Sequence, residues 1–215
     1  MTRPNIIKII CHDIGKHLGC YGVKSVNTNS IDSFAKDGIL FNNAFATSPG
    51  CSPSRAAIAT GRYPHNTGVL GLAHAHFGWS LDKKIKHIAK YFSSNDYNSI
   101  LFGLQHVTYH EETLGFKKIF PERPADHVIK NIEDNIDTIL FKKPFYAEVN
   151  FFEPHRPFDF GGVKSYRSKG VFIPKYIPNN SNIKKEFEAM QGAIKKMDAS
   201  VGKIINILKK KGLYE

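Results

Sequence analysis

Short apolar runs rich in isoleucine, valine and phenylalanine recur along the chain, and each leads directly into a polar loop. Three of them cover residues 6–11, 97–102 and 145–152. Runs of this length and composition between turn signals are typical of buried parallel strands. Longer segments with apolar residues at spacings of three and four lie between them, which predicts intervening helices. This alternation predicts one α/β domain with a mostly parallel central sheet and helices on both faces.

Different sequence patterns predict the individual helices. Residues 29–38 lie between capping residues and a glycine, residues 81–92 carry apolar side chains at helical spacing, and residues 126–140 form an amphipathic stripe. A long basic helix begins at Ser181, and its charged side is interpreted as a solvated face.

A fourth strand is predicted over residues 39–46, where it would deliver the chain to Cys51. Ile31 and Phe34, three residues apart on the first predicted helix, are core candidates. No internal repeat or low-complexity linker interrupts the 215 residues. We therefore expect no internal domain boundary.

The charge balance favours an anionic partner. The chain has 30 Lys and Arg against 19 Asp and Glu, a formal net charge of +11. A field of this sign attracts polyanions. Zinc-finger spacing, glycine-aromatic RNA-binding motifs and basic heptads are all absent from the sequence, which argues against nucleic acid as that polyanion.

The cysteines and the N-terminal residues of the sequence bear on where in the cell the protein is expected. Cysteines at positions 11, 20 and 51 form neither an even disulfide framework nor a paired zinc ligand set, which favours a reducing environment. The apolar run at residues 5–10 is too short to span a membrane and lacks a secretory cleavage site. We expect a cytoplasmic protein without a membrane segment.

The residues around Cys51 combine a reactive side chain with an anion-binding geometry. A turn at residues 48–50 precedes Cys51, and Pro53 suits the first turn of a short helix. Cys51 would then lie at a helix N-terminus, where free N–H groups and the helix dipole favour an anion and activate a thiol. A lone cysteine is more often a small buried apolar residue, but its neighbours here favour chemistry.

The segment Cys51-Ser52-Pro53-Ser54-Arg55, continued by Thr60-Gly61-Arg62, resembles the signature of the type I sulfatases, members of the alkaline-phosphatase-like superfamily. The resemblance implies that a maturation enzyme oxidises Cys51 to formylglycine, an aldehyde whose hydrate is the nucleophile. One hydroxyl of the hydrate attacks sulfur, and the second later expels the sulfate. Arg55 would steady the formylglycine.

His12 and Asp13 follow the first predicted strand, where sulfatases carry a pair of aspartates that bind a divalent cation, usually Ca²⁺. The resemblance implies that Asp13 is a metal ligand. Because imidazole suits softer metals than a carboxylate does, the role of His12 stays open. It is a ligand to a different metal, a contact to the substrate sulfate, or a loop residue.

Two further strand ends resemble sulfatases. His106 matches a histidine that contacts the sulfate, whereas Leu104 stands where the family usually has a lysine. His155 matches the histidine that protonates the leaving group, a role that suits an imidazole near neutral pH, and His106 is the alternative donor. Glu153-Pro154-His155-Arg156 resembles the heparan N-sulfatase (sulfamidase) branch, which adds Arg156 to the expected substrate contacts.

His74 and His76 lie two residues apart in a stretch rich in glycine. Without cysteine or carboxylate neighbours in the sequence, we interpret them as surface or substrate-edge residues rather than metal ligands.

The predicted function is hydrolysis of a sulfate ester or sulfamate on a sulfated small molecule or saccharide. We expect Asp13, His106 and His155 to converge on Cys51. Because the remaining cation ligands of sulfatases would follow residue 215, residues 1–215 are predicted to be the N-terminal part of a catalytic domain. A phosphate or phosphonate monoester hydrolase of the same superfamily and a catalytically incomplete fragment stay open as alternatives.

Overall fold

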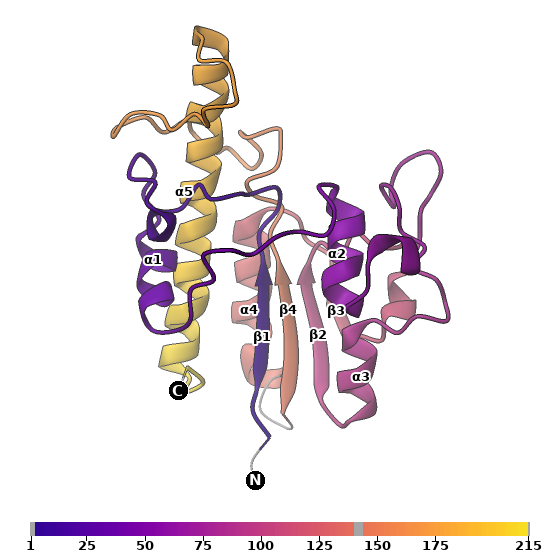
Figure 1. Ribbon diagram of the computed structural model, residues 1–215. Helices are drawn as coiled ribbons and strands as arrows, with labels where there is room; N and C mark the ends of the chain where they lie inside the picture. The colour runs from indigo at the N-terminus through magenta and orange to yellow at the C-terminus, as the bar shows by residue number, and fades with distance from the viewer. Residues whose placement is uncertain (1–2, 140–143, 215) are drawn as a thin grey trace. The chain divides into compact units, whose positions relative to one another are not determined.

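The computed structural model describes residues 3–139 and 144–214 (Figure 1). The chain divides into two compact units. Unit 1 comprises Met1–Ile10, Ala44–Arg123 and Lys130–Asn150, and unit 2 comprises Cys11–Asn43, Pro124–Ile129 and Phe151–Glu215.

Unit 1 contains a four-stranded sheet in the order β1-β4-β2-β3. Its strands are β1 (Ile6–Ile10), β2 (Asn98–Gly103), β3 (Lys118–Phe120) and β4 (Phe145–Asn150). Every pairing in this sheet is parallel, which confirms the predicted α/β class with a mostly parallel sheet. The first predicted strand, however, is only half-buried along its whole length, because β1 pairs with β4 alone among the described residues.

Three strands end level with one another. Asn150 pairs with Ile10 on one side and with Gly103 on the other. Parallel strands place their carboxyl ends at one edge of the sheet, which is where ligands bind in open α/β folds. The predicted site residues Asp13, His106 and His155 follow these three strand ends by three, three and five positions in the sequence.

The helices of the structure are α1 (Asn29–Lys36), α2 (Cys51–Thr60), α3 (Ile88–Ser94), α4 (Ala125–Ile139) and α5 (Ser181–Lys210), with short 3₁₀ turns at Gly19–Tyr21, Pro64–Asn66 and Glu111–Leu114. The predicted stripe of α4 is confirmed by buried Val128, Ile129, Ile132 and Ile136, whereas Leu140 lies outside the described residues. The core of unit 1 includes two clusters of buried residues. One joins Ala56, Val69, Val107 and Leu114, and the other joins Ala89, Tyr97 and Tyr146.

In unit 2, α5 contacts α1 and buries Ala193, Ile194, Met197, Val201 and Ile204. The Asp198 carboxylate accepts hydrogen bonds from the backbone N–H groups of Ser30 (3.2 Å) and Ile31 (2.8 Å), so α5 caps the first turn of α1. None of the helices in the described ranges combines the length and hydrophobicity needed to cross a bilayer.

Three predictions about these elements were wrong. Residues 39–46 form no strand, and Phe45 is 89% exposed. Phe34 is half-exposed rather than buried, because α1 meets α5 through its first turn. The helix predicted from residue 81 begins only at Ile88, because tertiary contacts claim the preceding backbone: the N–H of Leu81 bonds to the carbonyl of Val107.

Candidate functional site

Cys51 is the first residue of α2, as predicted. Gly50 is the N-cap in an extended conformation, Pro53 lies in the first turn, and Gly61 ends the helix at a φ of 66°. The left-handed conformation of Gly61 suits a glycine because a side chain would be strained there. The half-buried Cys51 side chain therefore lies among the free N–H groups at a helix N-terminus.

Arg55 lies one turn after Cys51 on the same side of the helix and is only 6% exposed. Its Nη1 donates a hydrogen bond of 3.3 Å to the carbonyl oxygen of Leu104. Leu104 is the residue that stands in place of the expected lysine. The Arg55 guanidinium therefore contacts the backbone of the loop after β2, although this loop lacks the family's lysine side chain.

His106 lies in a tight turn after β2 with a left-handed φ of 63°. The Gln105 side chain holds this turn: its Oε1 accepts from the N–H of Val107 (2.7 Å), and its Nε2 donates to the carbonyl of Thr108 (2.6 Å). Such a conformation is uncommon outside glycine and persists where surrounding contacts enforce it. It places a ring nitrogen of His106 within 4.8 Å of the Cys51 Sγ.

His74 contacts His106 directly. Its Nδ1 forms a hydrogen bond with the Nε2 of His106, and the ring centres lie 4.2 Å apart with planes 19° from parallel. His74 was interpreted as a surface or a substrate-edge residue, and its contact with His106 favours a position at the edge of the site. Sequence reasoning did not pair these histidines because 32 residues separate them.

Unit 2 holds a second group of predicted residues. The Asp13 carboxylate contacts the Nδ1 of buried His12 through Oδ1 (2.8 Å) and the Nε2 of His155 through Oδ2 (3.4 Å). The two imidazoles meet edge to face, with centres 4.5 Å apart. Asp13 also has a left-handed φ, of 45°. One exposed carboxylate thus bridges two histidines from separate loops.

These three side chains can hold a divalent cation. Each offers one donor atom, and the three atoms lie within 4.8 Å of one another. Ca²⁺ prefers six to eight oxygen ligands, whereas imidazole suits Zn²⁺ and other borderline metals. Two imidazoles and one carboxylate therefore fit a borderline cation better than Ca²⁺.

Glu153 supports this group and was missed as a candidate. Its backbone carbonyl accepts a hydrogen bond from the N–H of His12 (3.2 Å), and its Oε1 accepts from the N–H of Ala125 (3.0 Å). The side chain is buried, and burial raises the pKa of its carboxyl. A charged residue directly before Pro154-His155 was the available signal. Glu153 ties the His12 loop to the segment that carries His155.

Arg156 forms an ion pair with Glu186 on α5 (2.7 Å) and lies over the Phe158 ring. Its guanidinium is thus bound within unit 2, and its contact with a substrate stays a prediction.

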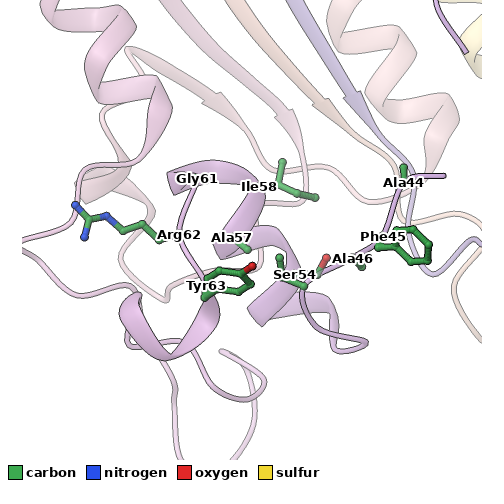
Figure 2. Close-up of a pocket in the computed structure, with 10 residues that line it drawn as sticks. Ala44, Phe45, Ala46, Ser54, Ala57, Ile58, Gly61, Arg62 and Tyr63 are labelled. Atoms are coloured by element: carbon green, nitrogen blue, oxygen red, sulfur yellow. The ribbon is translucent and has the colours of Figure 1, made fainter. Parts of the chain in front are cut away.

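A cavity of about 630 Å³ lies beside α2 in unit 1 (Figure 2). It is lined by Ala44, Phe45, Ala46, Thr47, Ser54, Ala57, Ile58, Gly61, Arg62 and Tyr63. Its helix residues recur at spacings of three and four, so they occupy one face of α2, and neither Cys51 nor Arg55 is among the lining residues.

A family profile described as Sulfatase matches residues 4–215. The chain belongs to the sulfatase family. Among curated sulfatases, it is 32% identical over 188 residues to an ulvan-active sulfatase of Formosa agariphila, covering 85% of this chain and 35% of that protein. It is 25% identical over 246 residues to human N-sulphoglucosamine sulphohydrolase, covering 99% of this chain and 48% of the relative. The chain thus spans about a third to a half of these sulfatases.

The sulfatase fold is equally clear. A crystal structure of a putative sulfatase from Bacteroides fragilis superposes with a TM-score of 0.81 at 22% identity, covering 98% of this chain and 59% of the other. This likeness confirms the predicted alkaline-phosphatase-like fold.

The structure thus brings the predicted sulfatase residues together in two groups. Cys51, Arg55 and His106 lie in unit 1, and His12, Asp13 and His155 lie in unit 2. Convergence of the two groups on one substrate stays a prediction.

Proposed function

We propose that this protein hydrolyses a sulfate ester or sulfamate carried by a saccharide. The observation that carries the proposal is Cys51 at the first position of α2, beside His106 and one turn before the buried Arg55. A helix N-terminus with a nearby guanidinium and imidazole favours a tetrahedral oxyanion. The names of the two curated relatives, one for ulvan and one for N-sulphoglucosamine, support a saccharide substrate.

The proposal gives each group one task. Formylglycine made from Cys51 by a maturation enzyme supplies the attacking oxygen as its hydrate. Arg55 holds the Leu104 carbonyl and steadies the formylglycine, and His106 donates a hydrogen bond to the sulfate. His155 gives a proton to the departing oxygen or nitrogen.

We further propose that Asp13 and His12 hold a divalent cation. Such an ion supplies positive charge that polarises the sulfate oxygens. Family resemblance favours Ca²⁺, whereas the imidazole of His12 favours a softer ion. Elemental analysis of the protein purified from metal-replete cells decides between them, with Asp13→Ala as the variant expected to lose the ion.

The test begins with co-expression of the chain and a formylglycine-generating enzyme. Mass spectrometry of the peptide containing residue 51 is expected to show an aldehyde in place of the thiol, and Cys51→Ala provides the unmodified control. The matured protein is then assayed on 4-nitrophenyl sulfate and 4-nitrophenyl phosphate. We expect the larger kcat/KM for the sulfate ester.

Two results would contradict the proposal. An intact thiol after co-expression would remove the nucleophile. A kcat/KM for the phosphate ester that is larger by orders of magnitude would indicate a phosphate or phosphonate monoester hydrolase. A matured protein that hydrolyses neither ester would favour the catalytically incomplete alternative.

A further inference from the structure

We propose that His74 is a positioning residue that sets the tautomer and orientation of His106. This inference rests on the proposed function, in which His106 donates a hydrogen bond to a substrate sulfate bound beside residue 51. In the proposed arrangement the Nδ1–H of His74 donates to the Nε2 of His106. The proton of neutral His106 then resides on Nδ1, the opposite side of the ring.

The contact itself is the first support. His74 Nδ1 and His106 Nε2 are hydrogen-bonded, and one nitrogen of His106 lies within 4.8 Å of Cys51 Sγ. The Nδ1 of His106 is buried from solvent, whereas His74 is exposed. The exposed His74 ring therefore contacts the His106 ring from the solvent side.

The backbone next to His74 is anchored to the cysteine helix. The N–H of Ala73 donates to the Oγ of Ser52 (3.1 Å), and both residues are buried. Ser52 is the residue between Cys51 and Pro53 in the sulfatase-type motif. The same motif that presents Cys51 therefore also fixes the loop that carries His74.

A second anchor lies three residues before His74. Gly71 lies against the Trp79 indole so closely that a Cβ at position 71 would come within 2.6 Å of the ring. Trp79 in turn packs on the core cluster of unit 1. The loop thus has two fixed points around His74, which suits a side chain that must position another one.

The chemistry selects the direction of the hydrogen bond. One proton lies between the two nitrogens, so either His106 donates or His74 donates. If His106 donated from Nε2, its neutral ring would carry only a lone pair at Nδ1, and this nitrogen could not donate to an anion. If His74 donates, Nδ1–H of His106 becomes a donor to the anion. Because Leu104 replaces the family's lysine, such a donor matters more here.

The test measures tautomers and anion binding without requiring turnover. Long-range ¹H–¹⁵N NMR at neutral pH reports which nitrogen of His106 carries the proton, in the wild type and in His74→Ala, His74→Asn and His76→Ala. His74→Asn retains an N–H donor close to the position of Nδ1. His76→Ala is the matched control, because it removes an exposed histidine of the same loop.

We expect the Nδ1–H form of His106 in the wild type, in His74→Asn and in His76→Ala, and its loss in His74→Ala. Affinity for inorganic sulfate should fall roughly tenfold in His74→Ala only, as expected for one hydrogen bond to a charged group. Circular dichroism confirms that each variant is folded.

Three outcomes would overturn the proposal. They are an Nε2–H tautomer in wild-type His106, an unchanged tautomer in His74→Ala, or His74→Asn behaving like His74→Ala. If the tautomers follow the expectation but sulfate does not bind, the positioning role stands and the proposed function fails.

Discussion

His87 links the stability of this protein to pH. It is the N-cap of α3, and its Nδ1 accepts a hydrogen bond from the N–H of Ala89 (3.1 Å). The residue is 3% exposed, and burial lowers its pKa to about 4, a shift that Glu148 opposes and Lys8 increases. Protonation at Nδ1 would also remove the acceptor that caps the helix.

The sign of the effect follows from proton binding in the two states. The unfolded chain protonates His87 near pH 6.5, whereas the folded protein does so only near pH 4. As pH falls below 6.5, the unfolded state takes up a proton that the native state lacks, so stability decreases until about pH 4. At about 1.4 kcal/mol per pKa unit, the loss is about 2 kcal/mol at pH 5 and about 3 kcal/mol once both states are protonated.

Urea unfolding at pH 8 and pH 5 measures this loss in the wild type and in His87→Asn. Asparagine keeps a capping oxygen but does not titrate. On going from pH 8 to pH 5, the free energy of unfolding should fall by about 2 kcal/mol more in the wild type than in the variant. Because the other titrating groups are the same in both proteins, their contributions cancel in this comparison. The control His65→Asn, which removes an exposed histidine, should follow the wild type. Equal pH dependence in the wild type and His87→Asn would refute the reasoning.

Two further substitutions test the packing. Gly192→Ala on α5 would place a Cβ 2.1 Å from the backbone oxygen of Lys164, so we expect a loss of about 1–3 kcal/mol in urea unfolding. Gly202→Ala, whose Cβ would meet only a serine side chain, should cost less, and equal losses would show that the close approach at residue 192 does not matter. Lys8→Met removes the cationic partner of the buried Glu148 carboxylate (2.7 Å), which among the described residues keeps only its neutral donors Tyr146 and Asn150, and should lower stability by about 3–5 kcal/mol at pH 7. A much smaller loss would indicate that Glu148 takes up a proton.

The features that could be predicted from sequence depend on neighbours within about ten residues. The apolar runs predicted β2 and β4, and the turn before Cys51 with Pro53 predicted the start of α2. Helical spacing predicted α4 to within one residue at its start. In each case the hydrogen bonds and the buried face belong to one element, so the local pattern is sufficient.

The failed predictions have a different physical origin. Residues 81–87 have helical spacing, but the N–H groups of Leu81 and Asp82 bond to the distant carbonyls of Val107 and Thr67. Phe34 has the position of a core residue, but the first turn of its helix docks on Asp198 and leaves the ring half-exposed. Tertiary hydrogen bonds outweighed periodicity in both places.

The sequence by itself determined the family, the parallel α/β fold and the chemical type of most site residues, because motif and periodicity are local. Only the tertiary structure decided which of those residues touch. Asp13 joins His12 to His155, Arg55 holds the Leu104 carbonyl, and Glu153 ties His12 to the start of α4. Such contacts join loops that are distant along the chain, and their geometry depends on how every intervening element packs.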